Sequence, residues 1–270
     1  MKISSNGPAT TKISGSNSET MVVRGYDLVN ELVGKISFTD HIWLLIAGVL
    51  PSDAQRRMLD AALVALAEHG MVPSVQASRM TLAAAPEALQ GAVAAGLLGC
   101  GSVILGAAEG AGKLFEQILD VERSQNVPTQ EAARVIVKRY RADRKAIPGY
   151  GHPYYKERDP RAQHLLAIAR QEGIAGRYTD AALAVDVAIP EIAGRRLVLN
   201  ISSAIASSLL DAGYPLLALR GVPILARTAS LVGHLLEEQT SPIGFLLSDA
   251  AASVVTYNGP APAGFATREN

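Results

Sequence analysis

The sequence is poor in cysteine and in aromatic residues. Cys100 is its single cysteine, so an internal disulfide framework is excluded and a metal site has only one thiol to draw on. This residue stands in the apolar run GLLGCG, where an inert buried thiol is expected. Aromatic residues make up 5% of the chain and apolar residues 49%. Such a composition, led by Ala, Leu, Val and Ile, is typical of closely packed helices rather than of an aromatic-rich sandwich.

The chain also lacks an excess of either charge, since Lys+Arg and Asp+Glu both number 25. A nucleic-acid partner is therefore not expected. The first residues lack the apolar centre of a signal peptide, and the clearest apolar run, Ile42–Leu50, is far shorter than the roughly 20 residues that span a bilayer. No HExxH or CxxC occurs, so no metal is expected. We expect a soluble cytoplasmic protein without a membrane partner.

What the sequence does contain is a series of helix signals. Residues 1–20 are rich in Ser, Thr, Asn and Gly and predict a mobile N-terminal arm. No run of short alternating segments with hairpin turns follows, so the predicted fold class is mainly α. The signals are a capping box, two proline-marked helix starts and two long apolar stretches, at Ser52–Gln55, Pro128–Thr129, Asp159–Pro160, 198–210 and 225–236.

The segment Pro148–His152 carries the most informative chemistry. Glycines on both sides of Tyr150 let the backbone turn sharply and approach a ligand. They place His152, which exchanges a proton near neutral pH, on a loop. Arg161 follows nine residues later on the first turn of a predicted helix, where its planar fork and the helix N-terminus both favour a carboxylate. The pattern predicts a proton-transfer group beside a carboxylate clamp.

This segment resembles the citrate synthase signature, which is close to PGxGHxxY/L-(K/R)xxDPR. The resemblance continues over most of residues 20–240, in Arg24–Asp27, Leu45–Pro51, Glu68–Gly70, Asn200–Pro215 and Ala226–His234. It implies a citrate synthase-like helical fold with a large domain (21–103 and 214–270) and a small domain (104–213) around a cleft. It also implies a homodimer.

The resemblance implies roles for individual residues. His152 would handle the proton of the substrate's carbonyl or hydroxyl oxygen. Arg161 and Arg227 would bind the carboxylates of a polycarboxylate, with a hydrogen bond from His69. Coenzyme A, entering as the substrate thioester, would be held by the backbone of Pro148, Gly149, Tyr150 and Gly151 and by Lys156. Structural alternatives stay open, since His69 would also suit a helix end, Arg227 an ion pair, and Lys156 a solvated surface.

Two family positions are altered. Ile104 stands where the family has a catalytic histidine in GPLHGGAN, and Ser202 stands where it has the catalytic aspartate of NVD. The citryl-CoA lyase module of ATP-citrate lyase resembles this chain around Glu68–Gly70 and Gly96–Phe115, and it too has an apolar residue in place of that histidine. A serine hydroxyl is a far weaker base than a carboxylate, so Ser202 would at most hold a water. Glu109 and Asp211 are other carboxylates, and nothing in the spacing selects either.

These departures favour citryl-CoA lyase-like cleavage of a citryl-type thioester to acetyl-CoA, or another acyl-CoA, and a 2-oxo acid such as oxaloacetate. Citrate synthase-type condensation is the first alternative. The second is a non-catalytic protein that binds coenzyme A and a carboxylate. The acyl group and the oxo acid stay open at this point, as does a separate CoA-ligase subunit as a partner.

Overall fold

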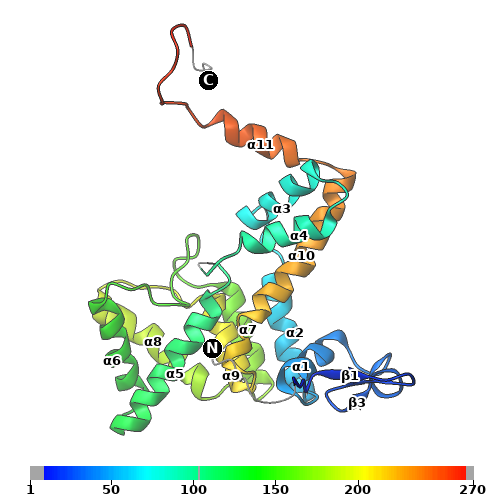
Figure 1. Ribbon diagram of the computed structural model, residues 1–270. Helices are drawn as coiled ribbons and strands as arrows, with labels where there is room; N and C mark the ends of the chain where they lie inside the picture. The colour runs from blue at the N-terminus through cyan, green and yellow to red at the C-terminus, as the bar shows by residue number, and fades with distance from the viewer. Residues whose placement is uncertain (1–8, 103, 266–270) are drawn as a thin grey trace. The chain divides into compact units, whose positions relative to one another are not determined.

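A computed structural model describes residues 9–102 and 104–265, and it is mainly helical, as predicted (Figure 1). Predicted helix starts agree with it at Asp53, Thr129 and Pro160. Val103 and residues 266–270, which fall in the predicted large domain, lie outside the described residues. The α-helices are α1 Phe38–Ala47, α2 Asp53–Ala67, α3 Pro73–Ala84, α4 Leu89–Leu98, α5 Ala107–Gln125, α6 Thr129–Ala142, α7 Pro160–Gln171, α8 Arg177–Ala193, α9 Ile201–Asp211, α10 Gly221–Thr240 and α11 Gly244–Ser253.

The helix starts follow from local capping chemistry. Ser52 and Gln55 form the predicted capping box, in which each backbone N–H donates to the other residue's side chain, at 2.8 and 3.2 Å. Asp159 accepts from the Arg161 N–H at 3.1 Å and so caps α7, with Pro160 at its first position. These contacts satisfy amide groups that a helix leaves open at its N-terminus.

The chain folds into two compact units. One contains the described residues up to Ala62 and Ala107–Arg220, and the other contains Leu63–Gly106 and the described residues from Gly221 onward. The predicted small domain, 104–213, falls almost wholly in the first unit, which also takes in residues that the prediction gave to the large domain. The division into a large and a small domain around a cleft stays a prediction.

The first unit has its core around α9. This helix packs against α5, α7 and α8, and α6 packs against α5 and α8. Most of α9 is buried, and its sequence ISSAIASSLLD is rich in Ala and Ser. Small side chains let neighbouring helices approach closely, while larger ones such as Phe115 of α5 and Leu166 of α7 fill the space between them.

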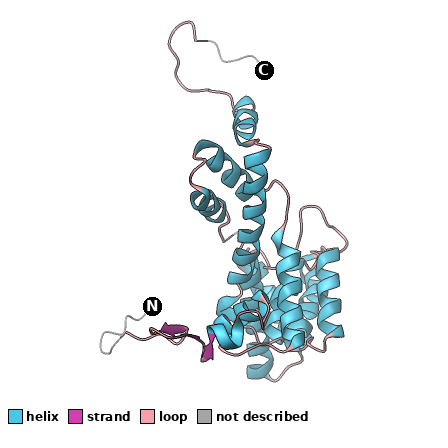
Figure 2. Cartoon of the chain, turned by 90° about the vertical axis from the view of Figure 1, so that its right-hand side faces the viewer, coloured by secondary structure: helices cyan, strands magenta, loops and turns pink. Residues whose placement is uncertain are grey.

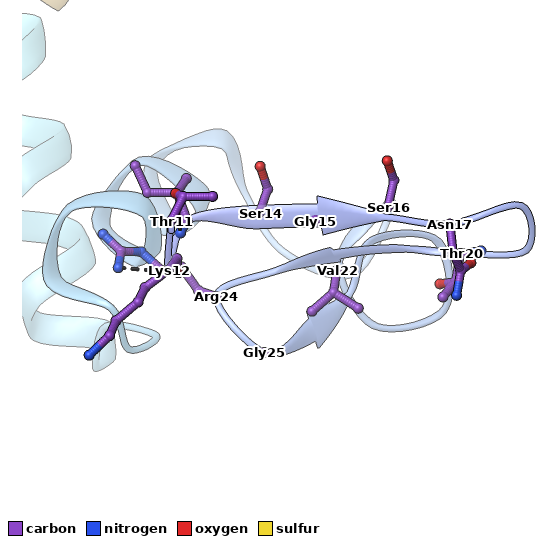
Figure 3. Close-up of a pocket in the computed structure, with 11 residues that line it drawn as sticks. Thr11, Lys12, Ser14, Gly15, Ser16, Asn17, Thr20, Val22, Arg24 and Gly25 are labelled. Carbon is purple, nitrogen blue, oxygen red and sulfur yellow. Dashed lines mark hydrogen bonds between the residues drawn. The ribbon is translucent and has the colours of Figure 1, made fainter. Parts of the chain in front are cut away.

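The N-terminal region holds a small antiparallel sheet that the sequence analysis did not predict. Strands β1 (Ser14–Ser16), β2 (Met21–Val23) and β3 (Tyr26–Asp27) pair in that order, with Ser16 opposite Met21. Figure 2 shows the strands in magenta. The Ser14 and Ser16 side chains extend from the same side of β1, as the two-residue period of a strand requires (Figure 3). Residues 1–8 of the predicted mobile arm lie outside the described residues.

The second unit packs α3, α4, α10 and α11 together. Its polar centre is Arg79, whose Nε donates to Glu238 at 2.7 Å while both side chains are buried. Glu238 also accepts from the Gly244 N–H at 2.7 Å and so holds the start of α11. A buried charge pair needs such extra hydrogen bonds to offset its desolvation.

One stretch of the described residues, Leu216–Thr240, is long and apolar enough by length and composition alone to cross a membrane. The sequence did not predict this stretch, because Arg220 and Arg227 interrupt its apolar residues. Arg227 and Glu238 are both buried within the folded chain. The expectation of no membrane partner stays a prediction.

Candidate functional site

The loop before α7 begins with a glycine in a conformation that other residues rarely adopt. Gly149 has φ +84°, and a Cβ added there would lie 2.8 Å from the Ser203 Oγ and 3.0 Å from the Ala111 Cβ. The loop backbone therefore lies directly against α9 and α5. Gly151 also has a positive φ, +92°, but only one atom lies near its Cβ position, at 3.9 Å. The predicted sharp turn on both sides of Tyr150 is confirmed.

Backbone hydrogen bonds join this loop to the segment that leads into α9. The Gly151 N–H donates to the Val198 carbonyl at 2.7 Å, and the Asn200 N–H donates to the Gly149 carbonyl at 3.0 Å. Asn200 also caps α9, and its Nδ2 donates to the Gly151 carbonyl at 2.9 Å. These bonds occupy backbone groups of Gly149 and Gly151, so coenzyme A would have to use others in the loop. Its binding by Pro148–Gly151 stays a prediction.

The Tyr150 side chain anchors the loop in the interior. It is 8% exposed, and its hydroxyl donates to the Ala182 carbonyl of α8 at 2.7 Å. Burial raises the pKa of this phenol well above its usual value, because the ionised form would lose its water. Tyr150 therefore positions the loop through its side chain, whereas the sequence predicted only a backbone role for it.

A Tyr150→Phe variant tests this anchor. It keeps the ring and loses one buried hydrogen bond, so we expect the free energy of unfolding to fall by about 1 kcal/mol. Urea denaturation of both proteins measures the difference. Tyr154→Phe is the matched control, because Tyr154 is 85% exposed and its loss of a hydroxyl should leave stability unchanged. Equal stability of all three proteins would contradict the anchoring role.

His152 is held in one orientation by the backbone of its own loop. Its Nδ1 accepts from the backbone N–H groups of Tyr154 and Tyr155, each at 3.1 Å. A neutral imidazole with an accepting Nδ1 carries its proton on Nε2. The Nε2 atom lies 3.5 Å from the Arg161 Nη2. The Arg161 Nη2 can only donate and by itself favours an accepting Nε2, but the two shorter N–H contacts at Nδ1 outweigh this single longer one, so we assign the proton to Nε2. With this assignment His152 presents an N–H donor beside a guanidinium, and it accepts a substrate proton at Nε2 only if the turn gives up Nδ1.

The surroundings keep the His152 ring neutral. Burial is the largest effect and lowers the pKa of the imidazole. The Asp159 carboxylate acts to raise it, and the charges of Arg161 and Lys156 lower it again, so the net shift is downward. Since the unperturbed value is 6.5, a lowered pKa leaves the ring uncharged at neutral pH.

Arg161 is oriented by the buried carboxylate of Asp159. Its Nε donates to the Asp159 Oδ1 at 3.1 Å and its Nη2 donates to the Oδ2 at 3.0 Å. Burial alone would raise the pKa of Asp159. The hydrogen bonds from the Arg161 side chain, the Arg161 charge and the hydrogen bonds from the Ile201 and Arg161 backbone N–H groups outweigh burial and keep the pKa below its usual value. Asp159 thus holds the Nε edge of the guanidinium, and the binding of a substrate carboxylate by Arg161 stays a prediction.

Asp159 also joins the loop to the helix that carries Ser202. Its Oδ2 accepts from the Ile201 N–H, the first residue of α9, at 3.1 Å. Ser202 follows in the same turn, and its own N–H donates to the Asn200 Oδ1 at 3.0 Å. The structure thus links Arg161, which lies beside His152, to the turn that bears Ser202 through one buried carboxylate. The sequence predicted Asp159 only as a helix cap.

Lys156 contacts its own loop. Its Nζ donates to the Pro153 carbonyl at 2.8 Å and lies 3.4 Å from the His152 carbonyl. The side chain is exposed. These contacts help to close the turn after His152, and its role in coenzyme A binding stays a prediction.

The second unit contains His69 and Arg227, the other two predicted substrate-binding residues. Arg227 lies within α10 and is 6% exposed. His69 follows the end of α2 and is partly buried. Their binding of substrate stays a prediction.

A hydrogen-bonded group beside His69 was missed by the sequence analysis. Glu68 accepts from the Ser230 Oγ at 2.6 Å and lies 3.0 Å from the His234 Nε2, and it also accepts from the Gly70 N–H. Burial acts to raise the pKa of Glu68, but these partners outweigh it and lower the pKa. Small residues of α10 and Glu68 line a hollow of about 550 Å³ beside this group. The contacts fix the turn that presents His69.

The two carboxylates left open by the sequence have structural partners. Asp211 accepts from the Gly176 N–H at 2.8 Å and from other groups at the start of α8. Glu109 pairs with Lys113 at 2.5 Å. Asp186, which the sequence analysis did not consider, is a partly buried carboxyl whose pKa is raised by burial.

Other features lie apart from these residues. Ile104, at the altered family position, is 42% exposed. A hollow of about 390 Å³ on the N-terminal hairpin is lined by residues such as Lys12, Ser14 and Arg24 and contains none of the predicted site residues (Figure 3). Within residues 9–102 and 104–265, no group of three metal-ligating side chains gathers. The absence of a metal from the reaction stays a prediction.

Comparison with known proteins identifies the family. The sequence profile of the citrate synthase C-terminal domain matches residues 51–244. The chain belongs to the citrate synthase family. The matched region contains all the residues predicted to act on substrate, namely His69, His152, Arg161, Ser202 and Arg227. Membership in this family makes the chain a member of an enzyme family.

Individual relatives agree with this assignment. Putative citrate synthase 2 of Mycobacterium tuberculosis H37Rv is 29% identical over 218 residues, which is 78% of this chain and 54% of that protein. The chain therefore spans about half the length of the curated relatives it matches.

Solved structures agree as well. The citryl-CoA lyase from Hydrogenobacter thermophilus has a TM-score of 0.84 at 34% identity, over 96% of this chain and 98% of that one. The ATP citrate lyase from Methanothrix soehngenii, solved with citrate and coenzyme A, has a TM-score of 0.75 at 21% identity, over 96% and 43% of the two chains. At that identity the second likeness shows the fold alone.

Proposed function

We propose that this chain cleaves a citryl-type CoA thioester to acetyl-CoA, or another acyl-CoA, and a 2-oxo acid such as oxaloacetate. The observation that carries the proposal is the pair formed by His152 Nε2, on the loop, and Arg161 Nη2, at the start of α7, which lie 3.5 Å apart. The neighbouring start of α9 has Ser202 in place of the family's aspartate. The likeness to a citryl-CoA lyase at 34% identity over nearly both whole chains supports cleavage.

The chemistry of cleavage fits a pair of donors. When the carbon–carbon bond of citryl-CoA breaks, the hydroxyl proton is lost and the oxygen becomes the carbonyl of the oxo acid. Loss of the hydroxyl proton places negative charge on that oxygen, and the charge passes to the thioester enolate as the carbon–carbon bond breaks. N–H donors fixed beforehand stabilise the oxygen while it carries charge that the bound alcohol lacks. We place the oxygen against His152 Nε2–H and Arg161. The hydroxyl proton passes to water and the enolate carbon of the leaving acyl-CoA takes one from water, so no net proton is needed.

This assignment changes one detail of the sequence prediction. The sequence predicted that His152 takes the hydroxyl proton itself, but its accepting Nδ1 places the ring's proton on Nε2. His152 therefore serves as a hydrogen-bond donor to the oxygen. Ser202, in the first turn of α9 and partly buried, holds the water that serves the enolate carbon. Coenzyme A is held by the backbone groups of Pro148–Gly151 that the hydrogen bonds to Val198 and Asn200 leave open, and by Lys156.

The test is to mix the purified protein with citryl-CoA and follow oxaloacetate and acetyl-CoA. Cleavage above the uncatalysed rate is expected. Condensation of acetyl-CoA with oxaloacetate, without cleavage, would replace the proposal with a synthase. If neither reaction occurs and coenzyme A still binds in a titration, the chain is a non-catalytic binding protein. A homodimer, a cytoplasmic location and a separate CoA-ligase partner stay predictions.

A Ser202→Asp variant tests why the chain favours cleavage. A carboxylate in the first turn of α9 is stabilised by the helix N-terminus and can remove the α-proton of a thioester. We expect exchange of the acetyl-CoA methyl protons in deuterated water to be near background in the wild type and to rise roughly 10²-fold in the variant. Ser203→Ala, at a fully buried neighbour, is the control. Equal exchange in wild type and Ser202→Asp would contradict the role given to position 202.

A further inference from the structure

Tyr155 contacts both members of the donor pair. Its ring lies 4.6 Å from the His152 ring, centroid to centroid, at an interplanar angle of 30°. The guanidinium carbon of Arg161 lies 5.8 Å from the centroid of the same Tyr155 ring. Its backbone N–H donates to the His152 Nδ1 at 3.1 Å. Three separate contacts thus converge from one residue, which neither the sequence analysis nor the proposed mechanism used.

Each contact constrains His152 in a different way. The hydrogen bond from the Tyr155 backbone N–H holds Nδ1 as an acceptor and so places the proton on Nε2. The stacked ring restricts rotation of the imidazole and covers one of its faces, since offset aromatic pairs resist separation. The guanidinium lies near the face of the phenol ring, where a cation is attracted. The phenol ring therefore holds imidazole and guanidinium at a fixed separation.

Tyr154 lacks this combination although it is the neighbouring tyrosine. Its N–H also donates to Nδ1 at 3.1 Å, but its ring centroid lies 5.9 Å from that of His152 and its side chain is 85% exposed. Tyr155 is 37% exposed. The two residues therefore share the backbone contact and differ in the ring contact, which makes them a matched pair for mutation.

We propose that Tyr155 is a positioning residue whose ring fixes His152 in the tautomer protonated at Nε2 and aligns it with Arg161 for the developing oxyanion. The backbone N–H group of residue 155 remains when the side chain is changed, but without the ring the imidazole is free to rotate away from it and lose the tautomer that it selects. The ring is then the only part that a Tyr155→Ala variant removes. The phenol hydroxyl has no part in the proposal, so Tyr155→Phe should behave as the wild type.

The first experiment measures the tautomer directly in the full chain without substrate. A long-range proton–nitrogen correlation spectrum distinguishes protonated from unprotonated ring nitrogens, and a His152→Gln variant assigns the His152 signals among the five histidines. We expect one tautomer, with the proton on Nε2, in the wild type, Tyr155→Phe and Tyr154→Ala. In Tyr155→Ala the two nitrogen signals should move toward each other, as exchange between tautomers averages them.

The second experiment measures citryl-CoA cleavage, and this arm rests on the proposed function. Tyr155→Ala should lower kcat by roughly two- to tenfold with little change in KM, because an aromatic pair contributes on this scale and the substrate's carboxylate contacts remain. Tyr155→Phe should restore the wild-type rate. Urea denaturation should give similar stability for all variants, because residues 153–158 are exposed.

The two experiments fail separately. A tautomer shift in Tyr155→Ala without any cleavage by the wild type would leave the positioning role standing and overturn the proposed function. Cleavage by the wild type with unchanged tautomer and unchanged kcat in Tyr155→Ala would overturn the positioning role alone. An effect of equal size in Tyr154→Ala would also overturn it, because that variant removes no stacked ring.

Discussion

Replacing His152 with alanine is expected to lower kcat for citryl-CoA cleavage by about 10²–10³-fold, the usual cost of removing one donor to an oxyanion. The variant loses the Nε2–H that lies 3.5 Å from Arg161 Nη2, while the Asp159–Arg161 contacts remain in place. KM should change little, since the lost contact strengthens only as charge develops on the oxygen. Steady-state kinetics of the two proteins measure this.

His152→Gln separates a donor from a proton-transfer group. A glutamine side chain can place an amide N–H close to the position of Nε2, but an amide neither gains nor loses a proton near neutral pH. If His152 acts as a donor, the glutamine variant should recover roughly tenfold of the loss seen with alanine. Equal rates for the glutamine and alanine variants would show that proton transfer by His152 is required, and the role drawn from its tautomer would be wrong.

Helix starts were predictable from sequence because capping is local. Ser52 and Gln55 satisfy each other three residues apart, and Asp159 caps a helix that begins at the next residue. The same holds for the glycines around Tyr150, since a positive φ at Gly149 and Gly151 is a property of the residue type. The mainly helical fold follows from many such signals acting in agreement.

Contacts between distant parts of the chain were not predictable in this way. The three-stranded antiparallel sheet at residues 14–27 has strands of two or three residues, which are too short for an alternating pattern to stand out. Glu68 and His234 lie 166 positions apart, and no local pattern relates them. The bond from Asp159 to the Ile201 N–H spans 42 positions and turns a predicted helix cap into a link between two helices.

In the candidate site, too, the residues of one local motif were predictable and the directions of their hydrogen bonds were not. His152 and Arg161 were predicted from one continuous motif, and the structure places the atoms His152 Nε2 and Arg161 Nη2 3.5 Å apart. The tautomer of His152 depends on the direction of two backbone N–H groups, which the residue types around it do not determine. For that reason the sequence could indicate the residue, while its predicted role as the group that takes the proton had no basis in the local pattern alone.

Replacing Asp159 with asparagine is expected to lower the free energy of unfolding by about 2–4 kcal/mol, somewhat less than the full cost of breaking a buried ion pair because Arg161 is 28% exposed. Asparagine remains a good helix cap, so the loss reports mainly on Arg161 and on the Ile201 N–H. Asp143→Asn is the matched control. Its ion pair with Lys145, at 2.9 Å, is largely exposed and should contribute less than about 1 kcal/mol.

The pH dependence of this difference has a defined sign. The folded-state pKa of Asp159 lies below its ordinary value of 3.8, so its stabilising effect is fully present above that pH. As the pH falls through the folded-state pKa, the carboxylate takes up a proton and the effect is lost. The stability gap between wild type and Asp159→Asn should therefore be constant near neutral pH and narrow in acid, as followed by urea denaturation across the pH range. A gap that widens in acid would mean that Asp159 stabilises the fold in its protonated form, and the charge-assisted link between Arg161 and α9 would be refuted.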